Sequence, residues 1–131
     1  MEDAEGRERR SFTTGEPVVI KIGYRKIKDV KNLGFGIGIH RVDGVHCYGT
    51  NTFIDDFEIE AEQIQDEGEI LCKIDPMSLV EGTYTLDVAV HDKEGLAYDY
   101  ITHILEFNVY SEIKDVGVSR LFHSWELVDK K

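Results

Sequence analysis

The segment from His40 to Thr50 carries side chains whose types and spacing suit hydrogen bonding to a neutral ligand. His40 and His46 flank a turn, and Tyr48 and Thr50 follow at alternate positions. Alternate residues of a β-strand share one face, so these side chains could act together. Two imidazoles without a third ligand leave a zinc site incomplete, and no histidine forms an H-x-H or H-E-x-x-H pair. The sequence therefore predicts polar ligand contacts, with no metal and no cofactor.

A second group of candidates lies later in the chain, where Tyr98 and Tyr100 alternate with Asp99 and Ile101. Aromatic rings stack on the C–H faces of sugars, whereas sugar hydroxyls need hydrogen-bond donors and acceptors. We expect the tyrosines to stack on sugar rings and the other candidates to bind hydroxyl groups. The predicted contacts are His40, Arg41, His46, Tyr48, Thr50, Tyr98 and Tyr100.

No residue is predicted to be catalytic. The segment GFGIGIH has G-x-G-x-G spacing and is followed by a turn and a strand, where a dinucleotide site needs a helix. The chain has no G-x-x-x-x-G-K-[ST] phosphate loop and no G-x-S-x-G motif. The acidic residues are abundant and alternate along the chain, so no pair of carboxylates stands out as a general acid and base.

The hairpin GFGIGIHRVDGVHCYGTNT, residues 34–52, places glycines 34, 36 and 38 at alternate positions. A two-residue turn at Asp43 and Gly44 would put Ile39 opposite Tyr48 and mix apolar with polar groups on one face. A three-residue turn, with Gly44 in the left-handed conformation, puts Ile39 opposite Cys47 and His40 opposite His46. We prefer the second register because it separates an apolar face from a polar one.

In the preferred register the glycines share a face with His40, His46, Tyr48 and Thr50, and form a strip of bare backbone. Glycine inside a strand costs roughly 0.5 to 1 kcal/mol relative to alanine, so three of them indicate that something approaches the sheet closely. A bound ligand is one explanation. A large side chain from a loop or from a neighbouring subunit is the other.

Short alternating segments recur at intervals of 10 to 15 residues and set the fold class. VVIKIGYR at 18–25 places Val18, Ile20, Ile22 and Tyr24 on one face, which is the period of a half-buried strand. Similar patterns follow in the hairpin, in FEIEAEQI, GEILCKID, TYTLDVAV and AYDYITHILEFNV, and in the terminal GVSRLFHSWELV. The pattern predicts an all-β protein, an antiparallel sandwich of seven to eight strands with almost no helix.

Composition narrows the possible partners and the compartment. The 131 residues include 26 acidic and 15 basic ones, a formal charge of -11, so nucleic acid and anionic membranes are not expected partners. Residues 1–11 are dense in charge and form either a disordered lead or a turn, and residues 12–131 form the sandwich. With no signal peptide or membrane span, and with Cys47 and Cys72 expected as free thiols, the sequence predicts a cytoplasmic protein.

Several segments together resemble a known family. They are F-x-x-G-E-P at 12–17, the hairpin at 34–52, EGTYTLDVAVHD at 81–92 and LFHSWEL at 121–127. They are similar to the C-terminal domain of Wzt-type proteins, the nucleotide-binding subunits of ABC exporters for O-antigen and related polysaccharides. The resemblance covers the chain from about Phe12 onward. In that family a strand usually precedes the position of Phe12, whereas only eleven residues do so here.

The resemblance implies an immunoglobulin-like β-sandwich that binds the exported polysaccharide or its modified terminus without being an enzyme. It also implies a homodimer formed by exchange of the C-terminal strand, and a link to the transporter's membrane subunit through an ATPase domain that this chain lacks. The domain would then act at the inner face of the cytoplasmic membrane. The alternative is a purely structural dimerisation module, whose glycine strip receives the partner's terminal strand.

Overall fold

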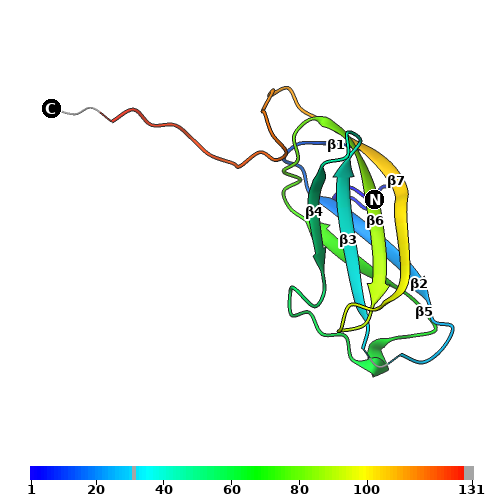
Figure 1. Cartoon of the computed structure of the whole chain (residues 1–131). Coiled ribbons are helices and arrows are strands. Elements are labelled where there is room, and N and C mark those ends of the chain that lie inside the picture. Colours follow the sequence, from blue (N-terminus) through cyan, green and yellow to red (C-terminus); the bar gives the residue numbers. More distant parts are fainter. Residues whose placement is uncertain (31, 129–131) are drawn as a thin grey trace.

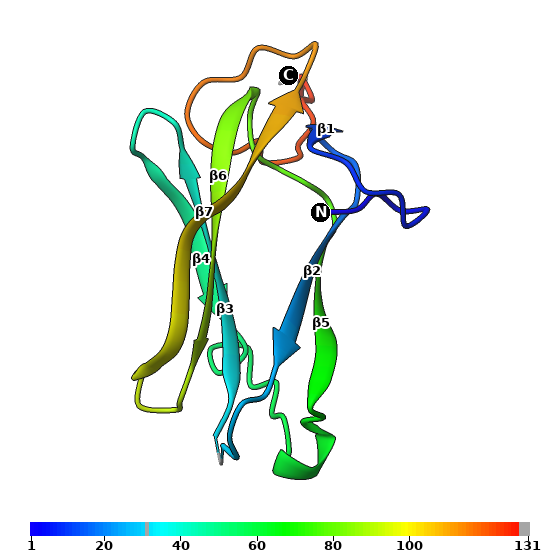
Figure 2. The same cartoon turned by 90° about the vertical axis from the view of Figure 1, so that its right-hand side faces the viewer.

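Two β-sheets packed face to face make up the molecule. The computed structural model describes residues 1–30 and 32–128. A five-stranded sheet has the order β1-β7-β6-β3-β4, and a two-stranded sheet pairs β2 with β5 (Figures 1 and 2). The strands are β1 (Ser11–Thr13), β2 (Val18–Arg25), β3 (Gly34–Arg41), β4 (His46–Asn51), β5 (Glu67–Ile74), β6 (Gly82–His91) and β7 (Ala97–Tyr110). The predicted all-β sandwich is confirmed, with seven strands in the described part of the chain.

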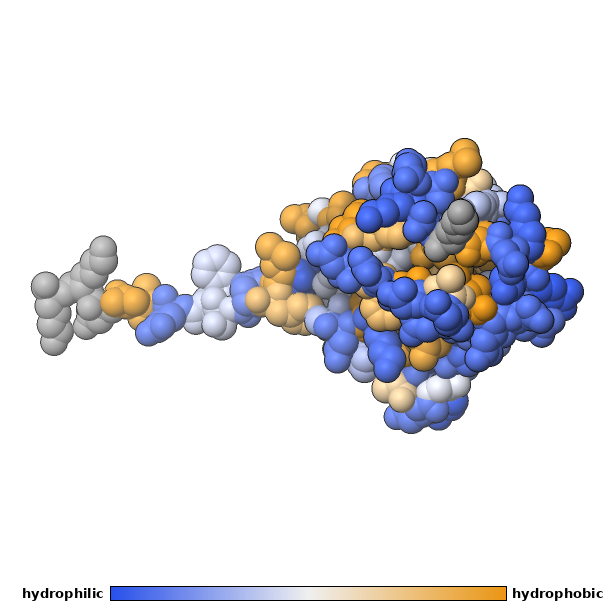
Figure 3. All heavy atoms as spheres, turned by 90° about the horizontal axis from the view of Figure 1, so that it is seen from below, coloured by the Kyte–Doolittle hydropathy of each residue, from blue (hydrophilic) through white to orange (hydrophobic). Residues whose placement is uncertain are grey.

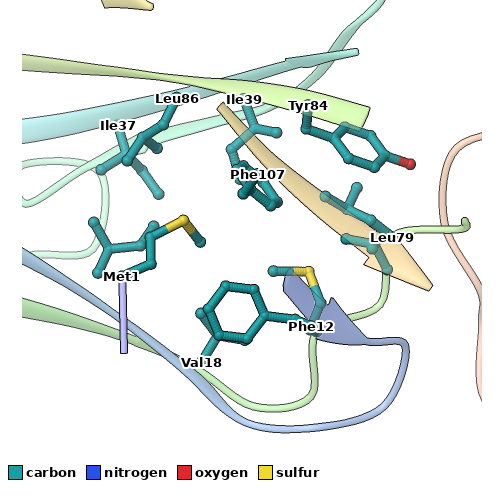
Figure 4. Close-up of a cluster of buried hydrophobic side chains, with 12 residues drawn as sticks. Met1, Phe12, Val18, Ile37, Ile39, Leu79, Tyr84, Leu86 and Phe107 are labelled. Atoms are coloured by element: carbon teal, nitrogen blue, oxygen red, sulfur yellow. The ribbon is translucent and has the colours of Figure 1, made fainter. Parts of the chain in front are cut away.

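The core forms because alternate side chains of both sheets point into the space between them. Phe12, Val18, Tyr84 and Phe107 are among its fully buried members and belong to one cluster (Figure 4). The Tyr84 hydroxyl donates a hydrogen bond to the Val80 carbonyl oxygen at 2.6 Å, which satisfies the only polar atom of that side chain. Burial raises the pKa of Tyr84 to about 12.

The first residues of the chain form a turn packed on the sandwich. Of the two alternatives for residues 1–11, the structure therefore shows the turn and not the disordered lead. Met1 belongs to the core, and Glu2 exchanges two backbone hydrogen bonds with Val19 of β2. The buried carboxylate of Asp3 accepts hydrogen bonds from the backbone N–H groups of Glu5 and Arg7, each at 3.0 Å. β1 then pairs with β7, in parallel, whereas the other strand pairs are antiparallel.

Two segments that the sequence predicts as strands are not strands in the structure. In FEIEAEQI a 3₁₀-helix covers Ala61–Gln63, held by a capping box between Glu60 and Gln63, and only Ile64 of this region is buried. At the C terminus, Leu79 forms an isolated bridge with Ser119. Beyond it the terminal tail, residues 121–128, extends away from the body and pairs with no strand (Figure 1).

The two-stranded sheet is narrower than the sheet it covers, so the sandwich has a cavity on each side. A cavity of about 490 Å³ lies between β2 and β7 and includes Ile22, Tyr24 and Ile101 in its lining. A smaller one of about 290 Å³ lies between β4 and β5. In the described residues, no helix is long and apolar enough to cross a membrane.

Candidate functional site

The turn of the β3–β4 hairpin is the three-residue turn that the sequence predicts. The Arg41 N–H donates to the Val45 carbonyl oxygen at 2.9 Å, which closes a loop of Val42, Asp43 and Gly44. Gly44 has φ +96°, the left-handed conformation that favours glycine. His40 lies opposite His46, as predicted.

The predicted register is wrong beyond His40, because β4 contains a bulge at Cys47. Ile39 lies opposite Tyr48 rather than Cys47, and Ile37 lies opposite Thr50. The extra residue shifts the pairing by one position, which moves each following side chain of β4 to the other face. Tyr48 and Thr50 therefore share the inner face with the isoleucines and do not border the glycines.

The glycines of β3 and β4 lie on the outer face of the five-stranded sheet, and this surface is the candidate site. We call it the glycine face and define its floor as Gly36, Gly38, Gly49 and Ala89. Gly36 pairs with Ala89 and Asn51, Ala89 pairs with Tyr100, and Gly38 pairs with Gly49 and Asp87. The side chains that surround the floor are His40, His46, Asn51, Phe53, Asp87, His91 and Tyr100.

Only part of the glycine strip is open to a ligand. A Cβ atom at Gly34 would overlap the ring of Phe53, so this loop side chain fills one end of the strip. Gly36 is buried, and its neighbours on the outer face include the Asn51 side chain and the His91 ring. Gly38 is half-buried and Gly49 is exposed. Packing by a loop side chain thus explains the glycine at Gly34, whereas Gly38 keeps backbone that a ligand could approach.

A buried carboxylate lies beside the two histidines of the glycine face. The side chain of Asp87 is 5% exposed, and its Oδ1 accepts a hydrogen bond of 2.8 Å from the backbone N–H of His103. His103 has φ +51°, within a β7 bulge that aims this N–H at the carboxylate. The His40 and His46 rings stack with centroids 4.6 Å apart and planes 18° apart.

Two buried polar atoms beside Asp87 have no hydrogen-bond partner within the part of the chain that the structure describes. They are Nδ1 of His40 and Oγ1 of Thr85, on residues that face each other across β3 and β6. Nδ1 lies 3.3 Å from Oδ2 of Asp87, but the direction does not suit a hydrogen bond. A water or a ligand hydroxyl that bridged these atoms would satisfy buried groups that are costly to leave unpaired.

The predicted contact residues do not gather at one place. His40, His46 and Tyr100 meet on the glycine face. Thr50 lines the cavity between β4 and β5, and Tyr98 lines the cavity between β2 and β7, where its hydroxyl lies 3.4 Å from the Asn32 carbonyl oxygen. Tyr48 is exposed at the sheet edge. Arg41 pairs with Asp43 at 3.0 Å and donates to the Gly117 carbonyl oxygen.

Four residues of the glycine face are absent from the sequence-based set: Asn51, Phe53, Asp87 and His91. Alternation along TYTLDVAVH does place Asp87 and His91 on the polar face of their strand. That signal identifies a face, but it does not say that β6 lies next to β3. In the described ranges, no group of three or more His, Cys, Asp or Glu side chains is arranged to hold a metal ion.

The fold and the site define a β-sandwich with a polar, partly aromatic outer face. A family model described as the Wzt C-terminal domain matches residues 1–121, and the chain belongs to this family. Among solved structures, one titled "Crystal structure of the C-terminal domain of wzt" has a TM-score of 0.82 at 20% identity. That alignment covers 97% of this chain and 79% of the other. No curated protein matches the sequence.

Proposed function

We propose that the chain is a non-catalytic carbohydrate-binding domain that contacts a cell-surface polysaccharide of O-antigen type through the glycine face. Binding would couple recognition of the polysaccharide to an ABC exporter, through an ATPase domain and the membrane subunit, at the inner face of the cytoplasmic membrane. Family membership supports the transporter setting.

The observation that carries the proposal is the combination of open backbone with an aromatic ring and unpaired polar atoms. Gly38 leaves room for close approach beside Asp87. Tyr100 is 58% exposed and pairs with Ala89, which in turn pairs with Gly36. A sugar ring over this floor would offer a C–H face to Tyr100 and hydroxyls to the histidine pair. The acidic protein would accept a neutral or mixed-charge polysaccharide more readily than a polyanion.

Matched tyrosine variants test the proposal. Tyr110 lies on the same strand, is 55% exposed and is remote from the glycine face, so Tyr110→Ala is the control for Tyr100→Ala. We expect Tyr100→Ala to weaken binding of the producing organism's polysaccharide at least tenfold by calorimetry, and Tyr110→Ala to leave it unchanged. Equal binding by both variants would contradict the proposed contact.

A second candidate function is homodimerisation through the terminal tail. Along residues 121–128 hydrophobic and polar residues are interspersed, and Trp125 and Leu127 are 92% and 99% exposed (Figure 3). Large apolar side chains on an extended segment are typical of a strand that pairs with another chain. The tail of one copy would add to a second copy in an exchanged dimer.

Truncation separates the two functions. We expect a chain that ends at Val116 to be a monomer by light scattering, where the full chain is a dimer. If glycan affinity persists in the monomer, the dimer serves assembly and the glycine face serves binding. If the full chain is itself monomeric at all concentrations, the dimerisation candidate is wrong.

A further inference from the structure

We propose that the cavity between β4 and β5 is a second carbohydrate subsite, which holds one sugar ring of the same polysaccharide. The inference rests on the proposed glycan-binding function and extends it to the other face of β4. The cavity has a volume of about 290 Å³, near the lower end of the range for small-molecule sites. Its lining includes Phe35, Thr50, Asp55, Phe57 and Cys72.

Backbone groups of β5 add donors and acceptors to this cavity. Val19 exchanges its hydrogen bonds with Glu2, on the side of β2 that faces away from β5. The alternate residues Ile20 and Ile22 therefore bond to Cys72 and Ile70, their partners in β5. By the same alternation, the N–H and C=O groups of Leu71 and Lys73 point out of the free edge of β5. Both residues line the cavity.

The side chains give the cavity a mixed polarity, so it suits a sugar better than it would suit an apolar β-strand. The ring of Phe57 is exposed at the rim. Within the described part of the chain, neither Thr50 nor Asp55 makes a side-chain hydrogen bond or ion pair. Two phenylalanine rings, other apolar side chains, a hydroxyl and a carboxylate match the mixed polarity of a sugar ring.

The cavity and the glycine face lie on opposite faces of a single edge strand. Thr50 points into the cavity, and the next residue, Asn51, borders Gly36 on the outer face. In the part of the chain that the structure describes, β4 is an edge strand of the five-stranded sheet. A polysaccharide can therefore cross the free edge of β4 and place successive sugars on both surfaces. Fragments long enough to reach both surfaces should bind more tightly than shorter ones.

The two free cysteines provide a direct test. Both thiols are half-buried and pack on the core, but Cys72 lines the cavity, whereas Cys47 lies at the β4 bulge and is not part of the lining. The rate of iodoacetamide labelling at each thiol is measured by mass spectrometry, with and without size-fractionated fragments of the producing organism's polysaccharide. We expect saturating fragments to slow labelling of Cys72 at least fivefold and to leave Cys47 unchanged. Thr50→Val should reduce the protection, whereas Thr13→Val, an exposed threonine on β1, should not.

Tyrosine and histidine ring resonances, recorded in the same samples, separate the possible failures. If the rings of His40 and Tyr100 shift while Cys72 stays unprotected, the cavity proposal is overturned and the glycine face stands. If neither responds, both proposals fail. If Cys72 is protected without sugar in the full chain but not in a chain ending at Arg120, the tail fills the cavity and the subsite is overturned.

Discussion

Gly34 and Gly38 lie on the same face of β3, but their surroundings give them different roles. A Cβ atom at Gly34 would overlap the Phe53 ring. The same ring packs against the His91 ring, with their centroids 5.3 Å apart. At Gly38 the same atom would lie 3.5 Å from Asp87, an ordinary contact distance. Gly34 is therefore required for packing of Phe53, whereas at Gly38 the backbone is left accessible.

We therefore expect Gly34→Ala to destabilise the protein by about 1 to 2 kcal/mol, because Phe53 must leave its position. Gly38→Ala should be neutral or stabilise it by up to about 1 kcal/mol, since alanine restricts the unfolded chain more than glycine does. Urea unfolding at neutral pH measures both. Equal losses in the two variants would show that Phe53 does not distinguish these positions.

The Cys72 thiol gives a second prediction at the scale of one residue. Burial, and to a lesser extent the negative charge of Asp55, raise the pKa of Cys72 above its ordinary value. A raised pKa lowers the thiolate fraction near pH 8, and the thiolate is the reactive form. Asp55→Asn should lower the pKa and speed labelling of Cys72 at pH 8. Labelling of Cys47, whose pKa is raised by burial and affected by Asp43 instead, should not change.

Among the elements, the β3–β4 hairpin shows how far the sequence predicts the site. The Asp43-Gly44 pair and the alternation around it correctly predict the turn and the pairing of His40 with His46. The bulge at Cys47 has no comparable signature, because a bulge depends on how the edge strand twists against its neighbour. One extra residue is enough to move Tyr48 and Thr50 to the other face.

The order of the strands in the sheet is the second feature that the sequence does not predict. Alternation identifies the polar faces of β6 and β7 separately, but the site depends on the order β7-β6-β3-β4. That order is set by contacts distant in sequence, such as Gly38 with Asp87 and Ala89 with Tyr100. Tyr100 is predicted as a contact residue because its side chain is aromatic. Asp87 is not predicted, because the sequence does not show that β6 lies beside β3.

The N-terminal lead is a small element whose stability should depend on pH. Hydrogen bonds from the backbone N–H of Arg7, then of Glu5, together with the Arg7 charge, lower the pKa of Asp3 despite its burial. A carboxylate with a lowered folded-state pKa stabilises the fold above its unfolded pKa of about 3.9, and this contribution is lost as pH falls through the folded pKa.

Asp3→Asn should therefore lower the urea midpoint at pH 7, and the difference from the original protein should shrink below about pH 4. The measurement is a series of unfolding curves from pH 7 to pH 3. Glu5→Gln is the control, since the Glu5 side chain is exposed. A difference that stayed constant with pH would show that the Asp3 charge does not stabilise the lead.

At the scale of the whole molecule, two features of the sandwich stand out: its cavities and its exposed apolar tail. The narrow β2–β5 sheet leaves cavities on both of its sides, and the tail leaves apolar side chains in solvent. The sequence predicts the terminal segment as a strand, yet residues 121–128 pair with no strand in the described part of the chain. If the tail pairs with a second copy, as the dimerisation candidate proposes, a sequence-based prediction for a single chain could not place it.

If the tail is exchanged, thermal stability should depend on protein concentration. A tenfold dilution should lower the Tm of the full chain and leave that of a chain ending at Val116 unchanged, because only a dimer is stabilised by mass action. Differential scanning calorimetry at two concentrations tests this. A Tm independent of concentration in both chains, with a monomeric mass, would contradict exchange.

The central claim is that the glycine face binds the polysaccharide, and side-chain NMR during a titration tests it most directly. Fragments of the producing organism's polysaccharide are added to the full chain while histidine and tyrosine ring resonances are followed. We predict that the rings of His40, His46 and Tyr100 shift together and saturate, while Tyr110 does not move. Unchanged resonances of all three rings at millimolar repeat-unit concentration would contradict the claim.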